Sequence, residues 1–385
     1  MIEVLIISII TFILFMYLLT KKSRQDNLST NVYSAEYYRG LNYLLNNEDD
    51  KALKIFTDLI DVDSSTIETH LALGGVYRRR GEFDKAILIH QNLLSRPKLD
   101  KSIKNQTLYE LGKDFFSAGL YDKSEKILLN LKDNKSYDQS CSEYLLLIYE
   151  LSKDWDNAIS FTNNLKQEKI RNTSIDLLIS QYYCEKAYEY QKDNQLNKSI
   201  TVLRKAIDIC KTSKRPFLML FKLNTRSNPN IALDNLVCLL KIDSMFLLVL
   251  AHELVELSTI HQDKKIDKRI YDIILDFSST DHFSPNLYEF MFNVSGYESP
   301  KEYVSKTNKN VFTNIFDNLY IRKNINNNES KTNQDLLSLI SENFLTYNCS
   351  NCGYTAKSHI WQCPSCNHWE TIEPNTISDR VSLDD

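Results

Sequence analysis

The chain has 385 residues, of which only 8 are glycine and 7 are proline. So few turn residues exclude β-sandwiches, barrels and collagen, which need frequent Gly or Pro turns, and they favour a helical fold. The 46 basic and 50 acidic residues give a net charge of −4, whereas a nucleic-acid-binding protein usually shows a basic surplus.

The first segment is a run of 17 uncharged residues at 4–20, between Glu3 and Lys21. A transmembrane helix needs roughly 17–25 apolar residues. A cleaved signal peptide would need positive charge before the run and a small-residue cleavage site after it, and neither is present. A buried core helix is the other alternative, but the run has no polar face. We therefore predict an uncleaved anchor at 1–20 and a juxtamembrane segment at 21–32.

The basic residues Lys21, Lys22 and Arg24 follow the apolar run directly. Positive charge marks the cytoplasmic end of a membrane span. The predicted location is thus a single-pass protein with most of the chain on the cytoplasmic side.

A block of small and aromatic residues repeats through the middle of the chain. Its small residue recurs at spacings of 34, 38, 34, 41 and 33, at Ala52, Ala86, Ser124, Ala158, Ser199 and Ala232. Such a period predicts pairs of amphipathic helices that stack into an array, the small residue letting the two helices approach. The longer spacings predict elongated turns or helices, and residues 264–276 are a candidate for a last degenerate copy.

The string L-G-x-x-Y at Leu73–Tyr77, followed by Ala86, resembles the tetratricopeptide repeat. The predicted fold is therefore all-α, with a tetratricopeptide-repeat superhelix over residues 33–321. An irregular helical bundle is the alternative, which the in-register copies disfavour.

An array of this kind presents a groove lined by its first helices, and Tyr and Arg are typical contact residues there. A solvated helix end is the alternative for Arg78, because the turn follows at Gly81. The predicted partner-binding residues are Tyr37, Glu68, Arg78, Tyr109, Lys113, Phe116, Glu143 and Tyr188.

No catalytic signature is present: the chain lacks a P-loop, a nucleophile elbow, a dinucleotide fingerprint and a metalloprotease helix. Cys141, Cys184, Cys210 and Cys238 lie singly in the repeats and are predicted to be buried in or near the core. The chain is therefore predicted not to be an enzyme. After the array, we predict a linker at 322–334 and a connecting helix at 335–346.

The strongest chemical motif is C-x2-C-x10-C-x2-C, formed by Cys349, Cys352, Cys363 and Cys366. Two residues between thiolates let both face one tetrahedral ion, and Gly353 and Asn367 follow each pair where the turn needs a positive φ. We predict a metal module at 347–374, followed by a tail at 375–385. Free or disulfide-paired cysteines are the alternative.

The pairs C-x-x-C-G-Y and C-P-x-C resemble rubredoxin and its relatives. A four-thiolate site takes one iron or zinc ion, and a structural role is favoured over a redox role because such sites are commonly closed. His359 and His368 are not needed as ligands. Trp361 and Trp369 are predicted to cover the small core or to pack it onto the repeats.

The order of anchor, repeats and metal module, with the strings HLALGGVYRRRGE, NCSNCGY and WQCPSCNHW, resembles the lipopolysaccharide assembly protein B family. The resemblance implies a non-catalytic bacterial inner-membrane protein whose metal module packs against the repeats. It also implies that the protein promotes degradation of the lipid A-committing deacetylase by a membrane AAA+ protease.

The implied partners are that protease, that deacetylase and other lipopolysaccharide assembly proteins, with a homodimer as a further option. Two alternatives remain open. One is a hub that organises lipopolysaccharide synthesis and transport enzymes, and the other is a rubredoxin-type electron-transfer protein.

Overall fold

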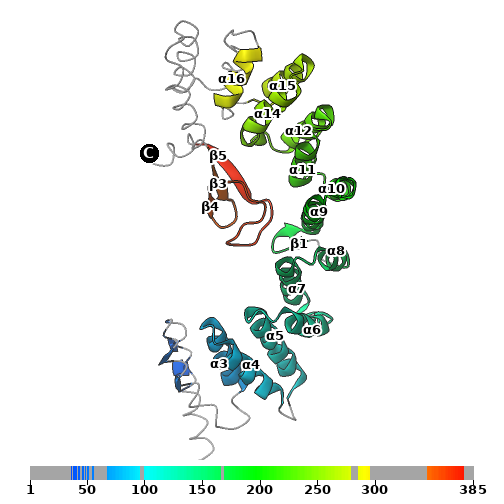
Figure 1. Ribbon diagram of the computed structural model, residues 1–385. Helices are drawn as coiled ribbons and strands as arrows, with labels where there is room; N and C mark the ends of the chain where they lie inside the picture. The colour runs from blue at the N-terminus through cyan, green and yellow to red at the C-terminus, as the bar shows by residue number, and fades with distance from the viewer. Residues whose placement is uncertain are drawn as a thin grey trace, which may run out of the picture. The chain divides into compact units, whose positions relative to one another are not determined.

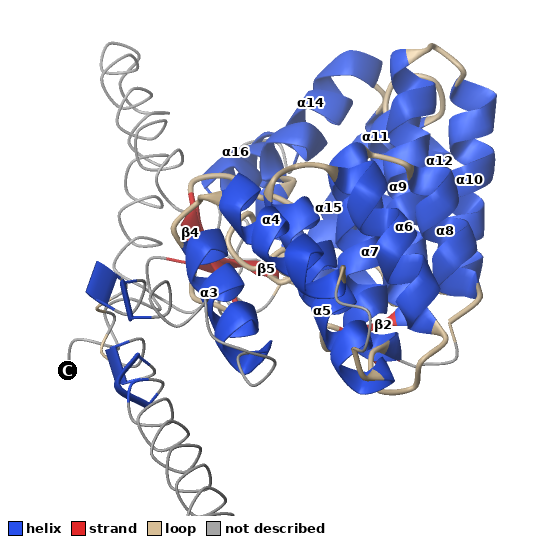
Figure 2. Ribbon diagram, turned by 90° about the horizontal axis from the view of Figure 1, so that it is seen from below, coloured by secondary structure: helices blue, strands red, loops and turns tan. Residues whose placement is uncertain are grey.

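The computed structural model describes residues 67–95, 99–165, 169–278, 285–294 and 345–376, with scattered positions between 36 and 55. The described residues are helical apart from a short hairpin and a small sheet near the C-terminus (Figure 2). The chain divides into two compact units, Met1–Ser152 and Lys153–Asp385, and each is described by itself below.

The first unit is a series of helices, each packed against the next along the chain (Figure 1). Asp100 is the N-cap of the helix that begins at Lys101, and its side chain accepts a hydrogen bond from the Ser102 amide at 2.8 Å. The helices are α3 (Ile67–Arg79), α4 (Phe83–Leu94), α5 (Lys101–Ser117), α6 (Tyr121–Lys132) and α7 (Asp138–Ser152).

The second unit continues the helical series and ends in the sheet. Its helices are α8 (Trp155–Asn163), α9 (Ile175–Lys192), α10 (Leu196–Ile209), α11 (Arg215–Asn224), α12 (Pro229–Ile242), α13 (Phe246–Val249), α14 (Ala251–His261), α15 (Lys264–Phe277) and α16 (Pro285–Val294). Its strands are β1 (Lys169–Ile170), β2 (Thr173–Ser174), β3 (Leu345–Cys349), β4 (Thr355–Ala356) and β5 (Ile372–Thr376).

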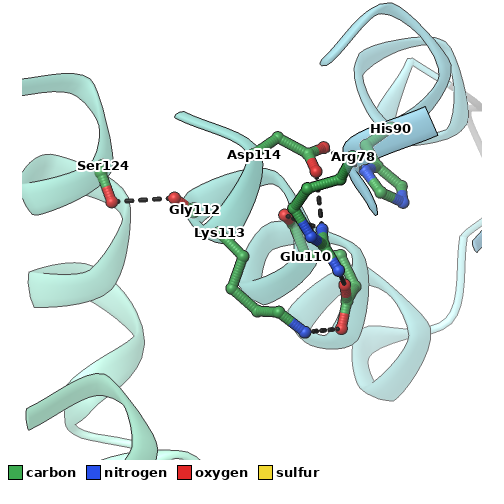
Figure 3. A network of polar contacts seen from close by, with 7 residues as sticks. All are labelled: Arg78, His90, Glu110, Gly112, Lys113, Asp114 and Ser124. Carbon is green, nitrogen blue, oxygen red and sulfur yellow. Dashed lines mark hydrogen bonds and ion pairs between the residues drawn. The ribbon is translucent and has the colours of Figure 1, made fainter. Parts of the chain in front are cut away.

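The repeat predicted from the sequence is present in both units. The recurring small residue is the fourth residue of α4, α6, α8, α10 and α12, and it is fully buried in each: Ala86, Ser124, Ala158, Ser199 and Ala232. Ala52 lies outside the described residues. In the α5–α6 pair, the Ser124 hydroxyl also donates to the Gly112 carbonyl at 2.8 Å (Figure 3). The predicted role of the small position is thus confirmed.

The turn inside the helix pairs also recurs, although not between α11 and α12. The residue two places before the second helix has a positive φ at Gly81 (77°), Gly119 (73°) and Asn194 (57°). At Gly81 and Gly119 the left-handed backbone costs a glycine little, and the amide that follows donates back to the carbonyl of an aromatic residue, Tyr77 or Phe115. Both glycines therefore lie in repeat turns, as predicted for Gly81.

The irregular spacings have visible causes. The step of 41 residues between Ala158 and Ser199 contains the antiparallel β1–β2 hairpin and α9, which is 18 residues long. The step of 38 contains α5, which has 17 residues where α3 has 13. The predicted last copy is α15, preceded by a left-handed Gln262, although Asp267 replaces the small residue at its fourth position.

Several predicted segments lie outside the described residues: the anchor at 1–20, the juxtamembrane segment at 21–32, the linker at 322–334 and residues 335–344 of the connecting helix. The prediction is wrong for positions 345 and 346, the end of that helix, because Leu345 and Thr346 begin strand β3 and pair with β5. Among the helices within the described ranges, none combines the length and the apolar character that a membrane crossing requires.

The close approach of α3 to α4 generates the first prediction. A Cβ on Gly74 would lie 2.4 Å from two atoms of the fully buried His90 ring, whereas one on Gly75 would meet nothing nearer than 3.9 Å. Gly74→Ala should lower the free energy of unfolding, because overpacking costs about 1–3 kcal/mol and exceeds a helix-propensity gain of about 1 kcal/mol. Gly75→Ala gains helix propensity without a clash, so it should raise the free energy of unfolding. Urea unfolding of the two variants checks the opposite signs.

Candidate metal centre and its docking site

The four cysteines of the C-terminal motif converge on one point. All four sulfur atoms lie within 4.8 Å of one another, with 3.7 Å between Cys349 and Cys366 and 3.6 Å between Cys352 and Cys363. Zinc–sulfur bonds of about 2.3 Å would place the corners of a tetrahedron about 3.8 Å apart, so the cluster fits a tetrahedral ion. A four-cysteine metal site is thus present. Four thiolate ligands can bind either zinc or iron.

Two matching turns hold the thiols. Gly353 has a φ of 74° and its amide donates to the Cys349 carbonyl at 2.9 Å, while Asn367 has a φ of 57° and its amide donates to the Cys363 carbonyl at 2.8 Å. These are the positive φ values predicted at both positions. Each turn therefore directs its pair of sulfurs to the same side.

The sheet gives the module its small core. Strand β3 is central and pairs antiparallel with both β4 and β5. The side chains of Tyr347, Cys349, Cys363 and Ile372 are buried together, with Val249 of the repeats packed against them. So small a core is marginal alone. A bound ion would link the two turns across it and contribute folding free energy.

The thiols differ in their electrostatic surroundings. Burial raises the pKa of Cys366, but donors led by the His368 amide outweigh it and lower the pKa to about 6. Burial raises the pKa of the Cys363 thiol to about 12. Because metals bind thiolates, loading the site must release the proton that Cys363 holds.

The module is attached to the repeats by Glu370, which lies beyond the second turn and has a φ of 53°. One oxygen of its carboxylate accepts hydrogen bonds from the amides of Lys214 (3.0 Å) and Arg215 (3.2 Å) and from the Ser213 hydroxyl (2.8 Å). These amides begin α11, whose own N-cap side chain makes no capping bond. Free amides at a helix N-terminus favour an anion. Glu370 therefore caps α11 from 155 residues away in the sequence.

Aromatic rings of the module surround Arg215 at the same place. Its guanidinium carbon lies 5.9 Å from the ring centre of Trp361 and 5.6 Å from that of Trp369, and Nη2 donates to Glu185 at 2.7 Å. Trp369 also meets Tyr182 of α9 edge to face. The module thus packs on α9 and α11 within the second unit (Figure 1), as the family resemblance implied.

His359 forms a third contact of the module with the repeats. Its ring lies 5.3 Å from that of Phe246 in α13 and 4.4 Å from that of Trp361, while Trp361 stacks on Phe246 at 6.0 Å. Burial, assisted by Lys214, lowers the pKa of His359 to about 4. The imidazole is therefore neutral at physiological pH and acts as part of an apolar contact.

Sequence reasoning missed Glu370 and Arg215 because their partners are remote in the chain. The Arg-Pro pair at 215–216 was a usable signal, since proline favours the first turn of a helix. It marks a helix N-terminus but does not indicate which carboxylate caps it.

The predicted groove residues are distributed over both units. Tyr37 lies outside the described residues, Glu68 and Tyr188 are exposed, and Tyr109, Lys113, Phe116 and Glu143 are partly buried. Arg78 is neither solvated nor free. Its side chain is 15% exposed and donates to Glu110 and Asp114, at 2.6 Å each (Figure 3).

Three of the four single cysteines are buried as predicted: Cys141, Cys184 and Cys210. The prediction is wrong for Cys238, which is exposed. Helix α12 buries the side chains at 232, 233, 236, 239 and 240, and position 238 falls on its other face.

The repeats and the metal module each match a known protein family. A rubredoxin metal binding domain matches residues 347–374, and a tetratricopeptide repeat matches residues 69–103. Lipopolysaccharide assembly protein B of Escherichia coli strain K12 is 27% identical, and that of Haemophilus influenzae strain Rd is 28% identical. Each match covers 92% of this chain and 92% of the relative.

Among solved structures, the C-terminal part of a TPR repeat-containing protein from Cytophaga hutchinsonii is similar at 12% identity, with a TM-score of 0.39. The match covers 73% of this chain and 98% of that one.

The metal centre generates the second prediction. Changing Cys352 and Cys366 to serine should abolish binding of the metal ion and unfold the module, because two of four ligands are lost. Metal analysis of the purified chain and tryptophan fluorescence check this, since Trp369 is only 3% exposed. Cys238→Ser removes an exposed thiol outside the cluster and should leave both readouts unchanged.

The Glu370 cap generates the third prediction. Glu370→Gln removes the charge that meets the α11 amides, and hydrogen bonds to charged groups contribute about 1.5–3 kcal/mol. Hydrogen exchange at the Lys214 and Arg215 amides should therefore accelerate about tenfold or more. Glu373→Gln alters an exposed carboxylate of β5 and should leave that exchange unchanged. Equal exchange in both variants would contradict the assigned role of Glu370.

Proposed function

We propose that this chain, a relative of lipopolysaccharide assembly protein B, is an adaptor that regulates lipopolysaccharide biosynthesis. The resemblance predicted from the sequence is confirmed by the two relatives. The chain is not an enzyme: it is a repeat protein with a metal module, and its relatives are named for assembly.

The observation that carries the proposal is the length of the similarity. It extends over 92% of the chain, and both the repeats and the metal module also match their own families. The repeat array offers surface for protein partners. The module supports that surface through Glu370 and the tryptophans around Arg215.

The finer proposal concerns proteolysis. The chain binds the deacetylase that commits material to lipid A and presents it to a membrane-bound AAA+ protease. An anchor at residues 1–20 would confine both partners to the inner membrane, on its cytoplasmic side. Holding two proteins on one scaffold raises their effective concentration and needs no catalytic residue. Groove residues such as Tyr109, Phe116 and Tyr188 are proposed contacts.

The fourth prediction tests this proposal in cells that depend on the chain. Depleting the full chain should lengthen the half-life of the deacetylase several-fold, measured by a pulse-chase or a translation block. Re-expression of the wild type or of Cys238→Ser should restore turnover, and the Cys352→Ser, Cys366→Ser double variant should not.

Two outcomes separate the alternatives. An unchanged deacetylase half-life on depletion would exclude the adaptor function. If transport components co-purify with the chain while deacetylase levels stay constant, the hub function is supported instead. The relatives' name, which refers to assembly, is the observation that favours this second function.

A further inference from the structure

A continuous row of aromatic rings lies in the first unit, on α5, at the start of α6, and on α7 and the residue just before it. Neighbouring ring centres along the row are 5.3, 6.2, 5.1 and 5.7 Å apart. All five rings are partly exposed. We call this row the tyrosine strip; in spatial order it consists of Tyr137, Tyr109, Tyr144, Phe116 and Tyr121.

The strip is uncharged at physiological pH. Burial raises the pKa of Tyr109 to about 12, and it also raises the pKa values of Tyr137 and Tyr144. The rings therefore offer neutral π faces, which attract cations.

One cation of the chain already uses the strip. The Lys113 ammonium lies 5.2 Å from the Tyr109 ring centre and 2.8 Å from a carboxylate oxygen of Glu110. The combination of a ring face and a carboxylate thus holds an ammonium group here. The other oxygen of Glu110 and one of Asp114 accept from Arg78, so the cations beside the strip are already neutralised (Figure 3).

The next ring along the strip, Tyr144, also has a carboxylate beside it, but among the described residues no ammonium or guanidinium group is bound there. Glu143 precedes Tyr144 in α7 and acts electrostatically on it, and its carboxylate accepts a 3.3 Å hydrogen bond from the neutral Gln139 amide. Within the described part of the first unit, no cation pairs with Glu143 or lies over the rings of Tyr144 and Phe116. Arg78 also acts electrostatically on Tyr144, but its ion pairs are with Glu110 and Asp114, so this position has rings and a negative charge without a paired cation.

We infer that the tyrosine strip is a docking surface for a basic segment of a protein partner, with a lysine or arginine seated between Tyr144, Phe116 and Glu143. The charge at the surface selects the occupant, because an acidic segment would meet Glu143 with like charge. Lys113 on Tyr109 is the internal example of the contact. The inference rests on the proposed adaptor function and names the chemistry of its partner.

Binding of a short amidated leucine–lysine peptide to the purified full chain tests the inference, with the same peptide carrying glutamate for lysine as its counterpart. Calorimetry should detect the lysine peptide alone. Glu143→Gln and Tyr144→Leu should each weaken it about 3- to 10-fold, and added salt should weaken it further. Asp84→Asn removes one exposed carboxylate of α4 and should leave the affinity unchanged.

Equal binding of both peptides, no binding of either, or an equal effect of Glu143→Gln and Asp84→Asn would overturn the inference. The deacetylase half-life keeps this test separate from the proposed function. If turnover depends on the chain but the lysine peptide does not bind, the adaptor function stands and the docking surface is wrong. If the peptide binds as described but deacetylase turnover is independent of the chain, the docking surface stands and the adaptor function is wrong.

Discussion

The close approach of the two helices in each repeat is the constraint on which the rest of the structure depends. Where α5 meets α6, a hydroxyl on one helix donates to a carbonyl on the other, and a Cβ on Gly112 would come within 3.1 Å of Leu128. A larger side chain at such a point would separate the helices and open their shared core. Every surface proposed for a partner is built on pairs that pack in this way.

The second unit shows how a helix N-terminus can join two parts of a chain. The first amides of α11 have no partner within their own helix, so they require an acceptor from elsewhere. Glu370 supplies it from the metal module, and Trp361 and Trp369 enclose the neighbouring Arg215. A metal ion bound by the four cysteines would fold the module and so also hold this acceptor in place.

The first unit shows why charged groove residues are poor guides to partner binding when taken one at a time. Arg78 resembles an exposed contact residue in the sequence, yet it forms ion pairs with Glu110 and Asp114 and stabilises the contact between α3 and α5. Removing one member would leave a partly buried charge unpaired, which is costly. The neighbouring rings, which are neutral and partly exposed, are the better candidates for contact with another protein.

Local patterns in the sequence were sufficient to predict many features of the fold and of the metal site. The recurring small residue, the turn at Gly81, and the positive φ at Gly353 and Asn367 all follow from sterics within a few residues, so the sequence alone predicted them. The four-cysteine spacing predicted a metal site for the same reason.

Contacts between distant residues were decided only by the tertiary structure. Glu370 and the α11 amides are 155 residues apart, and nothing near either one indicates the other. The tyrosine strip likewise joins rings from α5, α6 and α7 that share no local pattern. The sequence by itself determined the helices, their period and the ligand set, because short-range geometry governs them. Only folding decided which carboxylate caps α11, which arginine is neutralised and which rings meet, because these depend on how separate elements pack.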